Sequence, residues 1–111
     1  MCRHVSDIAR LDDARYVAQC EHASVLLAWG HCTWHLPPTD FLTLAALLGQ
    51  EDGEAGCFVL NRYEDKSLLW CGDACLVLRG ERLGEFRRLV ALAAPRLARR
   101  EVPAGYGLHL N

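Results

Sequence analysis

The segment QCEHASVLLAWGHCTWHLPPTDFLTLAALLG, residues 19–49, decides the fold of this chain because a degenerate copy of it follows at residues 62–94. The copy reads RYEDKSLLWCGDACLVLRGERLGEFRRLVALAA. At an offset of 43 residues, the identical pairs are Glu21 with Glu64, Ser24 with Ser67, Leu26 with Leu69 and Cys32 with Cys75. After a two-residue insertion, the pairs at an offset of 45 are Phe41 with Phe86, Leu44 with Leu89, Ala46 with Ala91 and Leu47 with Leu92. The alternative is that burial alone imposes one apolar pattern on any two units of strands and a helix.

Each copy begins with two strand-length apolar runs. In the first copy these runs are residues 24–29 and 32–36, and Gly30-His31 between them suits a two-residue hairpin turn. A helix should follow, with Thr39 or Asp40 as its N-cap. Its apolar stripe consists of Phe41, Leu44, Ala45 and Leu48.

The second copy predicts the same elements. Strands are expected over residues 57–61, 67–71 and 74–78, with Gly72-Asp73 as the second hairpin turn. A helix from about residue 84 to residue 100 follows, and Pro95 is expected to kink or split it. Its apolar stripe consists of Phe86, Leu89, Val90, Ala93 and Leu97.

The remaining segments are less regular. Residues 1–7 are expected to form an extended arm, and residues 8–11 and 14–20 a further hairpin. Residues 50–56 form an acidic loop between the copies, and the tail after residue 100 suits a short edge strand.

These elements predict an α+β fold in which two pseudo-repeated antiparallel strand-strand-helix units pack as one domain. The units cover about residues 8–49 and 57–100 of a single domain, residues 1–111. Either unit alone would expose an apolar face, so pseudo-twofold packing of the two is expected. The predicted core aromatic residues are Trp29, Trp34, Trp70, Phe41 and Phe86.

Composition favours a cytoplasmic protein. The chain is 51% hydrophobic and 23% charged, which is ordinary for a globular domain and excludes a disordered or collagen-like chain. The first fifteen residues are charged where a secretory signal needs an apolar stretch, and no apolar run is long enough to span a membrane. In the cytoplasm, six cysteines are expected to be reduced.

Histidine and cysteine concentrate in the first 35 residues, which hold four of the five histidines. The pairs Cys2-x-His4 and Cys20-x-His22 each present two zinc-ligand side chains on one side of a strand. The sequence therefore predicts a structural zinc site formed by Cys2, His4, Cys20 and His22. The alternative is that these side chains bond backbone groups, since Tyr63 and Asp65 stand at the matching positions of the second copy.

The other cysteines give weaker signals for catalysis. His31-Cys32 lacks the arginine of a phosphatase loop, because Pro38 stands where that arginine would be. Cys32 and His35 point to opposite faces of a strand, which argues against a nucleophile and base pair. Cys71 and Cys75 flank a hairpin turn and are expected to approach each other across it.

Positive charge concentrates near the last helix. Residues 1–78 carry eleven acidic and five basic side chains, whereas residues 79–111 carry seven arginines and three acids. A partner's acidic surface would be met by Arg87, Arg88, Arg96, Arg99 and Arg100. A solvated helix face is the alternative, and nucleic acid is a less favoured partner because no aromatic stacking motif accompanies these arginines.

One arrangement resembles a family of small bacterial proteins of unknown function. It consists of an early Cys2, then Cys20-Glu21-His22-Ala23, an apolar strand ending at Gly30, a second strand, and a helix opened by Pro-Thr-Asp-Phe41. That family carries a C-x-x-C where this chain has Cys20 to Ala23, and His22 stands in for the second cysteine. The resemblance covers the first half of the chain and implies no activity.

The sequence thus favours a non-catalytic module that binds a protein partner or forms a homodimer, with a structural zinc as an additional prediction. The alternative is a thiol- or metal-dependent enzyme that uses Cys20, His22, Cys32 and His35. The two differ in surface shape, since an enzyme needs a concave pocket with convergent polar groups.

Overall fold

The computed structural model describes the backbone of residues 4–101 and the side chains of residues 4–97. In chain order, its elements are β1 (Val5–Asp12), β2 (Arg15–Cys20), β3 (Val25–Trp29), β4 (Cys32–Leu36), α1 (Pro38–Leu47), β5 (Gly53–Ala55), β6 (Phe58–Tyr63), β7 (Lys66–Cys71), β8 (Ala74–Arg79) and α2 (Arg82–Glu101). The fold is α+β, as predicted. The expected tail strand and the first three residues of the expected arm lie outside the described residues.

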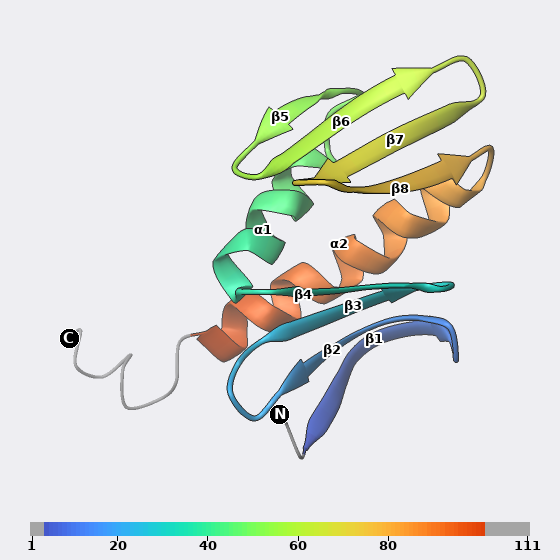
Figure 1. Cartoon of the computed structure of the whole chain (residues 1–111). Helices are drawn as coiled ribbons and strands as arrows, with labels where there is room; N and C mark the ends of the chain where they lie inside the picture. Colours follow the sequence, from blue (N-terminus) through green and yellow to red (C-terminus); the bar gives the residue numbers. More distant parts are fainter. Residues whose placement is uncertain (1–3, 102–111) are drawn as a thin grey trace.

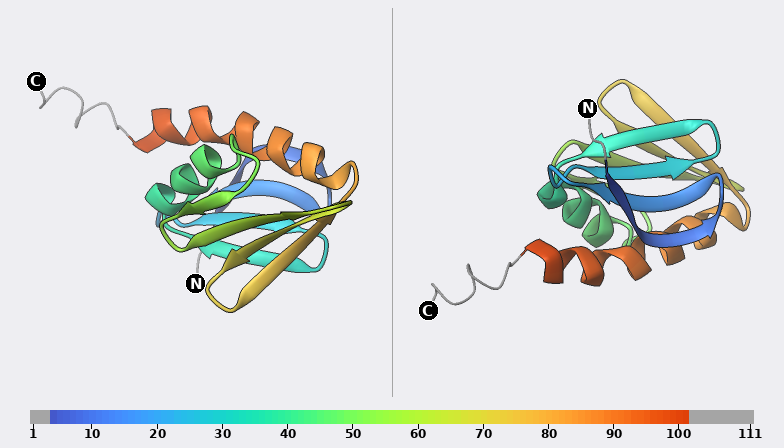
Figure 2. Two further views of the ribbon diagram at one scale, coloured as in Figure 1. Left: turned by 90° about the horizontal axis from the view of Figure 1, so that it is seen from above. Right: turned by 90° about the horizontal axis from the view of Figure 1, so that it is seen from below.

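The strands form two separate antiparallel sheets, each in simple sequence order. The first sheet has the order β1-β2-β3-β4 and precedes α1, and the second has the order β5-β6-β7-β8 and precedes α2. The two sheets lie one above the other with both helices between them in Figure 1. Seen from above and below, the sheets cross each other and the helices lie along one side of them (Figure 2).

One apolar core joins both sheets and both helices. Trp29 of β3 meets Phe86 of α2 edge to face, with ring centroids 5.1 Å apart. Trp34 of β4 meets Phe58 of β6 across the two sheets, with centroids 6.3 Å apart. With Phe41, which is fully buried, four of the five predicted core aromatic residues are confirmed.

Trp70 is the exception, because it lies on the side of β7 that faces away from the core. Its neighbours Leu69 and Ser67 are buried, whereas Trp70 is only partly buried. The reason is turn length. The Cys20 backbone N–H donates to the Ser24 carbonyl, so three residues close the turn between β2 and β3, whereas only two separate the paired residues Tyr63 and Lys66 in the turn between β6 and β7. The turn is one residue shorter, and a shift of one residue moves a side chain to the other face of a sheet.

The same shift overturns part of the residue alignment between the copies. The pair that closes the first hairpin turn is Trp29 with Cys32, and the corresponding pair in the second sheet is Cys71 with Ala74. The offset is therefore 42 in these strands, so that Leu26 corresponds to Leu68 and not to Leu69. Gly30 and Gly72 occupy the same turn position with φ of 64° and 61°, a conformation that favours glycine.

Both helices begin earlier than the sequence predicts. Pro37 is the N-cap of α1 and Pro38 its first residue, in place of a cap at Thr39 or Asp40. Proline suits the first helical position because its missing N–H has no intrahelical partner there. The second helix, α2, begins at Arg82 and runs through Pro95 without interruption to Glu101.

Strand β5 was not expected, since residues 50–56 carry no apolar alternation. It is held by pairing with β6, in which Glu54 lies opposite Val59 and Ala55 opposite Phe58. The strand is fixed by its neighbour and not by its own sequence.

Polar contacts of α2 and the β2 strand tie the two halves of the chain together. Arg15 donates to Asp12 and to Glu85, each at 2.7 Å, and its guanidinium lies over the Trp29 ring. Glu85 also accepts from Arg82 at 2.8 Å, and the hydrogen bonds from Arg82 and Arg15 lower the pKa of its carboxyl. Within the described residues, neither helix is long and apolar enough to cross a membrane.

Leu47 and Leu92 give a test of how far the two helices are equivalent. The sequence aligns them, but Leu47 is fully buried whereas Leu92 is 44% exposed. We expect Leu47→Ala to lower the free energy of unfolding by about 2–5 kcal/mol. Leu92→Ala should change it by only about 0.5 kcal/mol. Urea denaturation of both variants measures the difference, and equal losses would contradict this packing.

Candidate functional site

The outward side of the second sheet carries a continuous set of apolar side chains. Pairing places Val59, Trp70 and Cys75 in one row across β6, β7 and β8. The next row is Asn61, Leu68 and Val77, and the last is Tyr63, Lys66 and Arg79. We define the outer apolar face as Val59, Tyr63, Leu68, Trp70, Cys75 and Val77.

This face is uncovered within the described structure. Both helices lie on the other side of the second sheet in Figure 1, where the inward residues of its strands are buried. Tyr63 is 51% exposed and Val77 is 45% exposed, and the other members are partly exposed. An exposed aromatic and aliphatic patch with polar residues along one end is typical of a surface that contacts another protein.

The outward side of the first sheet differs in character. At the positions that correspond to Val77 and Cys75, strand β4 carries the exposed polar residues His35 and Thr33. The Tyr16 ring is occupied by the Arg10 guanidinium, which lies 4.6 Å from the ring centroid. The first sheet therefore has no equivalent of the outer apolar face.

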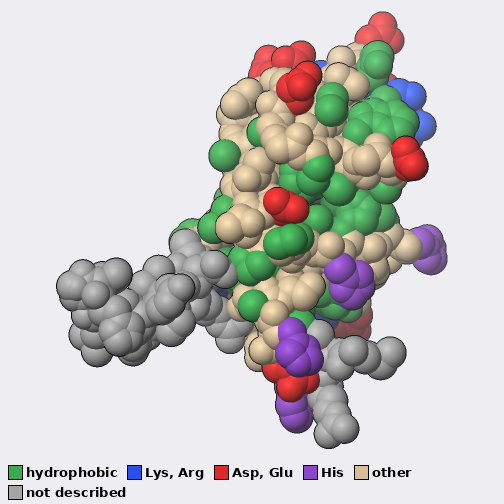
Figure 3. All heavy atoms as spheres, turned by 60° about the vertical axis from the view of Figure 1, so that its left-hand side comes forward, with side chains coloured by type: hydrophobic (Ala, Val, Ile, Leu, Met, Phe, Trp, Pro, Cys, Tyr) green, Lys and Arg blue, Asp and Glu red, His purple; other side chains and the backbone are tan. Residues whose placement is uncertain are grey.

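Of the predicted zinc ligands, Cys20 and His22 lie at the turn between β2 and β3, and His4, just before β1, contacts Glu21 of that turn. His4 and His22 are exposed, and the His4 backbone N–H donates to the Glu21 carboxylate at 3.2 Å. Ala23 holds this turn with φ of 72°, a strained value for a residue with a Cβ atom. The histidine side chains visible in Figure 3 are separated from one another by other side chains and do not form one cluster.

Cys20 is in a disulfide, which differs from the expectation of reduced thiols. Its Sγ also accepts the His22 backbone N–H at 3.3 Å. A disulfide sulfur does not offer the thiolate that zinc binds, so the predicted site needs the reduced form. Among the described residues, no group of three or more metal-ligating side chains lies close enough to hold an ion. Cys2, the remaining predicted ligand, lies outside the described residues.

A pair of thiols lies where β7 ends and β6 begins, and the sequence did not predict it. The Sγ atoms of Cys57 and Cys71 lie 3.8 Å apart, and both cysteines are free. Cys75 does not approach Cys71 as expected, because adjacent pairing puts Cys71 opposite Ala74 and Cys75 opposite Trp70. No spacing in the sequence signals the Cys57 contact, since it arises from the pairing of β6 with β7.

Cys32 and His35 lie on opposite sides of β4, as the sequence indicates. Cys32 shares the inner side with Trp34, whereas His35 is exposed on the outer side. Burial raises the pKa of the Cys32 thiol, which lowers its thiolate fraction at neutral pH. This arrangement does not place a base beside the thiol.

The arginines predicted to bind a partner have different surroundings. Arg87 donates to the Gln50 carbonyl at 2.8 Å, and Arg96 donates to the Ile8 carbonyl. Both contacts fasten α2 to the rest of the fold. Arg88 is exposed, and the side chains of Arg99 and Arg100 lie outside the described part of the chain.

Comparison of the chain with protein-family models, with curated proteins and with solved structures finds no match. Any function of this chain must therefore be inferred from the geometry of its described residues.

Titration of Cys71 tests the thiol pair. Burial, the hydrogen bond with Cys57, and the charges of Cys57 and Asp40 raise the pKa of Cys71 to about 11. The neutral thiol is the form favoured by folding, so its contribution to stability is present below the unfolded pKa near 9 and is lost as pH rises toward 11.

We expect the ultraviolet absorbance of the Cys71 thiolate, taken as a difference from Cys71→Ser, to rise at about pH 11. Removing the neighbour with Cys57→Ala should lower the midpoint. An unchanged midpoint would show that the Cys57 thiol does not influence Cys71.

Proposed function

We propose that this protein is a small non-catalytic module that binds a second copy of itself or another protein through the outer apolar face. The observation that carries the proposal is the uncovered position of Trp70, Tyr63 and Val77 on the second sheet. A folded chain gains nothing by holding a tryptophan partly in water when a buried position is available, so a function outside the monomer accounts for it.

The composition of the face supports protein binding. Tyr and Trp are enriched at the centres of protein interfaces, whereas Lys and Glu are depleted there. The aromatic and aliphatic members cover three strands, and Lys66 and Arg79 stand only in the terminal row beside Tyr63. A partner would thus meet an apolar centre with a basic edge.

The pseudo-repeat belongs to the same proposal. Each sheet precedes one helix, and Phe41 and Phe86 are buried at corresponding places in the two helices. We infer that two repeated units pack about a pseudo-twofold axis, and that the second unit has acquired the binding face. A cytoplasmic location is also part of the proposal.

A structural zinc at the end of the β2–β3 hairpin would stabilise the reduced form of the protein. Protein purified under reducing conditions, without a His-tag or chelator, should retain about one zinc per chain through Cys2, His4, Cys20 and His22. Cys20→Ser should abolish that zinc content. Substoichiometric zinc in the unaltered protein, measured by elemental analysis, would contradict the metal site.

Self-association through the outer apolar face is tested by one matched pair of variants. Val77 of β8 and His35 of β4 occupy corresponding outward positions, opposite Leu68 and Leu26. We expect the unaltered chain to show a mass that rises with concentration in sedimentation experiments. Val77→Lys should weaken association at least about tenfold, because it places a charge in an apolar contact.

His35→Lys is the control, since it adds the same charge to the same position of the other sheet. It should leave the association constant unchanged. Equal effects of the two variants, or a monomer at every concentration tested, would contradict self-association through this face.

A further inference from the structure

Strand β8 differs from the other border strands of the two sheets, which are β1, β4 and β5. Strand β1 has irregular register at two places, β5 has only three residues, and β4 is followed directly by Pro37 and Pro38. Strand β8 pairs regularly with β7 over six residues, with no proline and no inward-pointing charge, and its hairpin extends past the first sheet in Figure 2. Bulges, prolines, charges and short length keep a border strand from pairing with another chain. Within the described structure, the edge of β8 lacks these protections.

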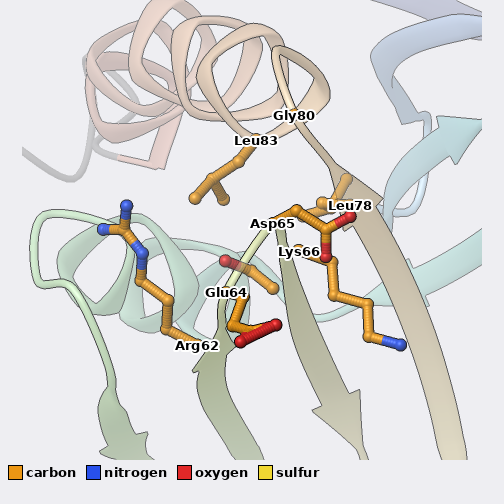
Figure 4. A pocket seen from close by; sticks show the side chains of 8 residues that line it. Arg62, Glu64, Asp65, Lys66, Leu78, Gly80 and Leu83 are labelled. Atoms are coloured by element: carbon orange, nitrogen blue, oxygen red, sulfur yellow. The ribbon is translucent and has the colours of Figure 1, made fainter.

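The backbone groups on this edge belong to alternate residues. In an antiparallel pair, residues that exchange hydrogen bonds with the neighbouring strand alternate with residues whose N–H and C=O point away from it. The Gly80 N–H donates to the Asp65 carbonyl at 3.0 Å, at the end of β8 shown in Figure 4. This bond fixes the alternation, so the even-numbered residues of β8 bond to β7. The N–H and C=O groups of Cys75, Val77 and Arg79 therefore point away from β7.

The two ends of the β8 edge carry opposite charges. Asp73 lies in the turn before β8, Arg79 is the last residue of the strand, and both are exposed. Pairing places Lys66 directly opposite Arg79, and like charges at opposite positions of a sheet are unfavourable. Within the described residues, none of these three side chains makes an ion pair. A negative charge brought beside Arg79 would relieve the repulsion.

A second copy of the chain supplies that charge when β8 pairs with itself in antiparallel fashion. With Leu76 on the twofold axis, Asp73 of each copy lies opposite Arg79 of the other copy. Cys75 lies opposite Val77, and their free backbone groups form a hydrogen-bonded pair. An axis at Val77 would instead place Arg79 opposite Cys75, without a carboxylate. One register thus satisfies the charges and the backbone together.

We propose that this protein forms a homodimer in which the β8 strands of two copies pair in the register centred on Leu76. The proposal rests on the proposed function and deepens it, because Cys75 and Val77 of the outer apolar face supply the apolar part of the contact. The two sheets join into one, and the remaining members of both outer apolar faces lie on the same side of it.

A charge exchange tests the register. Asp73→Arg alone and Arg79→Asp alone each place like charges opposite one another at both ends of the contact, because the twofold axis repeats every change. We expect each variant to weaken self-association at least about tenfold in sedimentation equilibrium at low salt. The variant with both substitutions restores opposite charges, so its dissociation constant should return to within about threefold of that of the unaltered chain. Both positions are exposed, and unchanged thermal midpoints of dilute monomer would show that the fold is kept.

Two controls separate this register from other modes of association. Asp52→Arg makes the same change of charge in the exposed loop before β5, at the opposite border of the sheet, and should leave association unchanged. Tyr63 belongs to the outer apolar face but lies on β6, out of reach of a contact at the β8 edge. Tyr63→Lys should therefore leave association unchanged, whereas it would weaken a dimer in which the two outer apolar faces stack on each other.

The edge pairing would be overturned if the single charge variants associate as tightly as the unaltered chain, or if the double variant does not recover. If Val77→Lys and Tyr63→Lys weaken association in that case, the faces stack on each other and the proposed function stands without the edge pairing. A chain that is monomeric up to about 0.5 mM would also overturn the edge pairing, because even weak specific interfaces associate below that concentration. Binding of a different protein would then be the remaining form of the proposed function.

Discussion

The contact between the inner sides of the two sheets is the constraint on which the rest of this structure depends. Each four-stranded sheet has one strongly apolar side, and neither sheet can bury that side alone. Trp34 and Phe58 join the sheets directly, and Trp29 and Phe86 join the first sheet to the last helix. The helices complete the core, so the segments before and after residue 50 need each other to fold.

This mutual burial also explains the polar contacts between distant segments. Arg15 and Glu85 are 70 positions apart in the chain, yet their ion pair lies beside the Trp29 ring that packs on Phe86. Arg96 and Arg87 hold the carbonyls of Ile8 and Gln50 in the same way. Arginines that resemble a binding cluster in the sequence therefore serve in part to fasten α2 across the molecule.

Most of the elements could be predicted from the sequence because their signals are local. Alternating apolar residues, the glycine turns at Gly30 and Gly72, and helical spacing each depend on a few neighbouring residues. Strand β5 has no such signal and is defined by its pairing with β6. The predicted burial of Trp70 was wrong for a related reason, since the face on which Trp70 lies depends on a turn that is one residue shorter than its counterpart. The thiol contact of Cys57 with Cys71 is likewise a product of pairing.

One difference in register decides which side chains of β7 face the core and which face outward. The shorter turn places Ser67 where the first sheet has Val25, and Trp70 where it has Ala28. The sequence therefore puts a hydroxyl inside and a tryptophan outside, although the opposite exchange would bury more apolar surface. Departures from the pattern that burial favours are expected where a chain binds something. Because both departures follow from the same two-residue turn, lengthening that turn by one residue would exchange the inward and outward side chains of β7 and remove Trp70 from the outer apolar face, whereas Val77→Lys changes that face without changing the register.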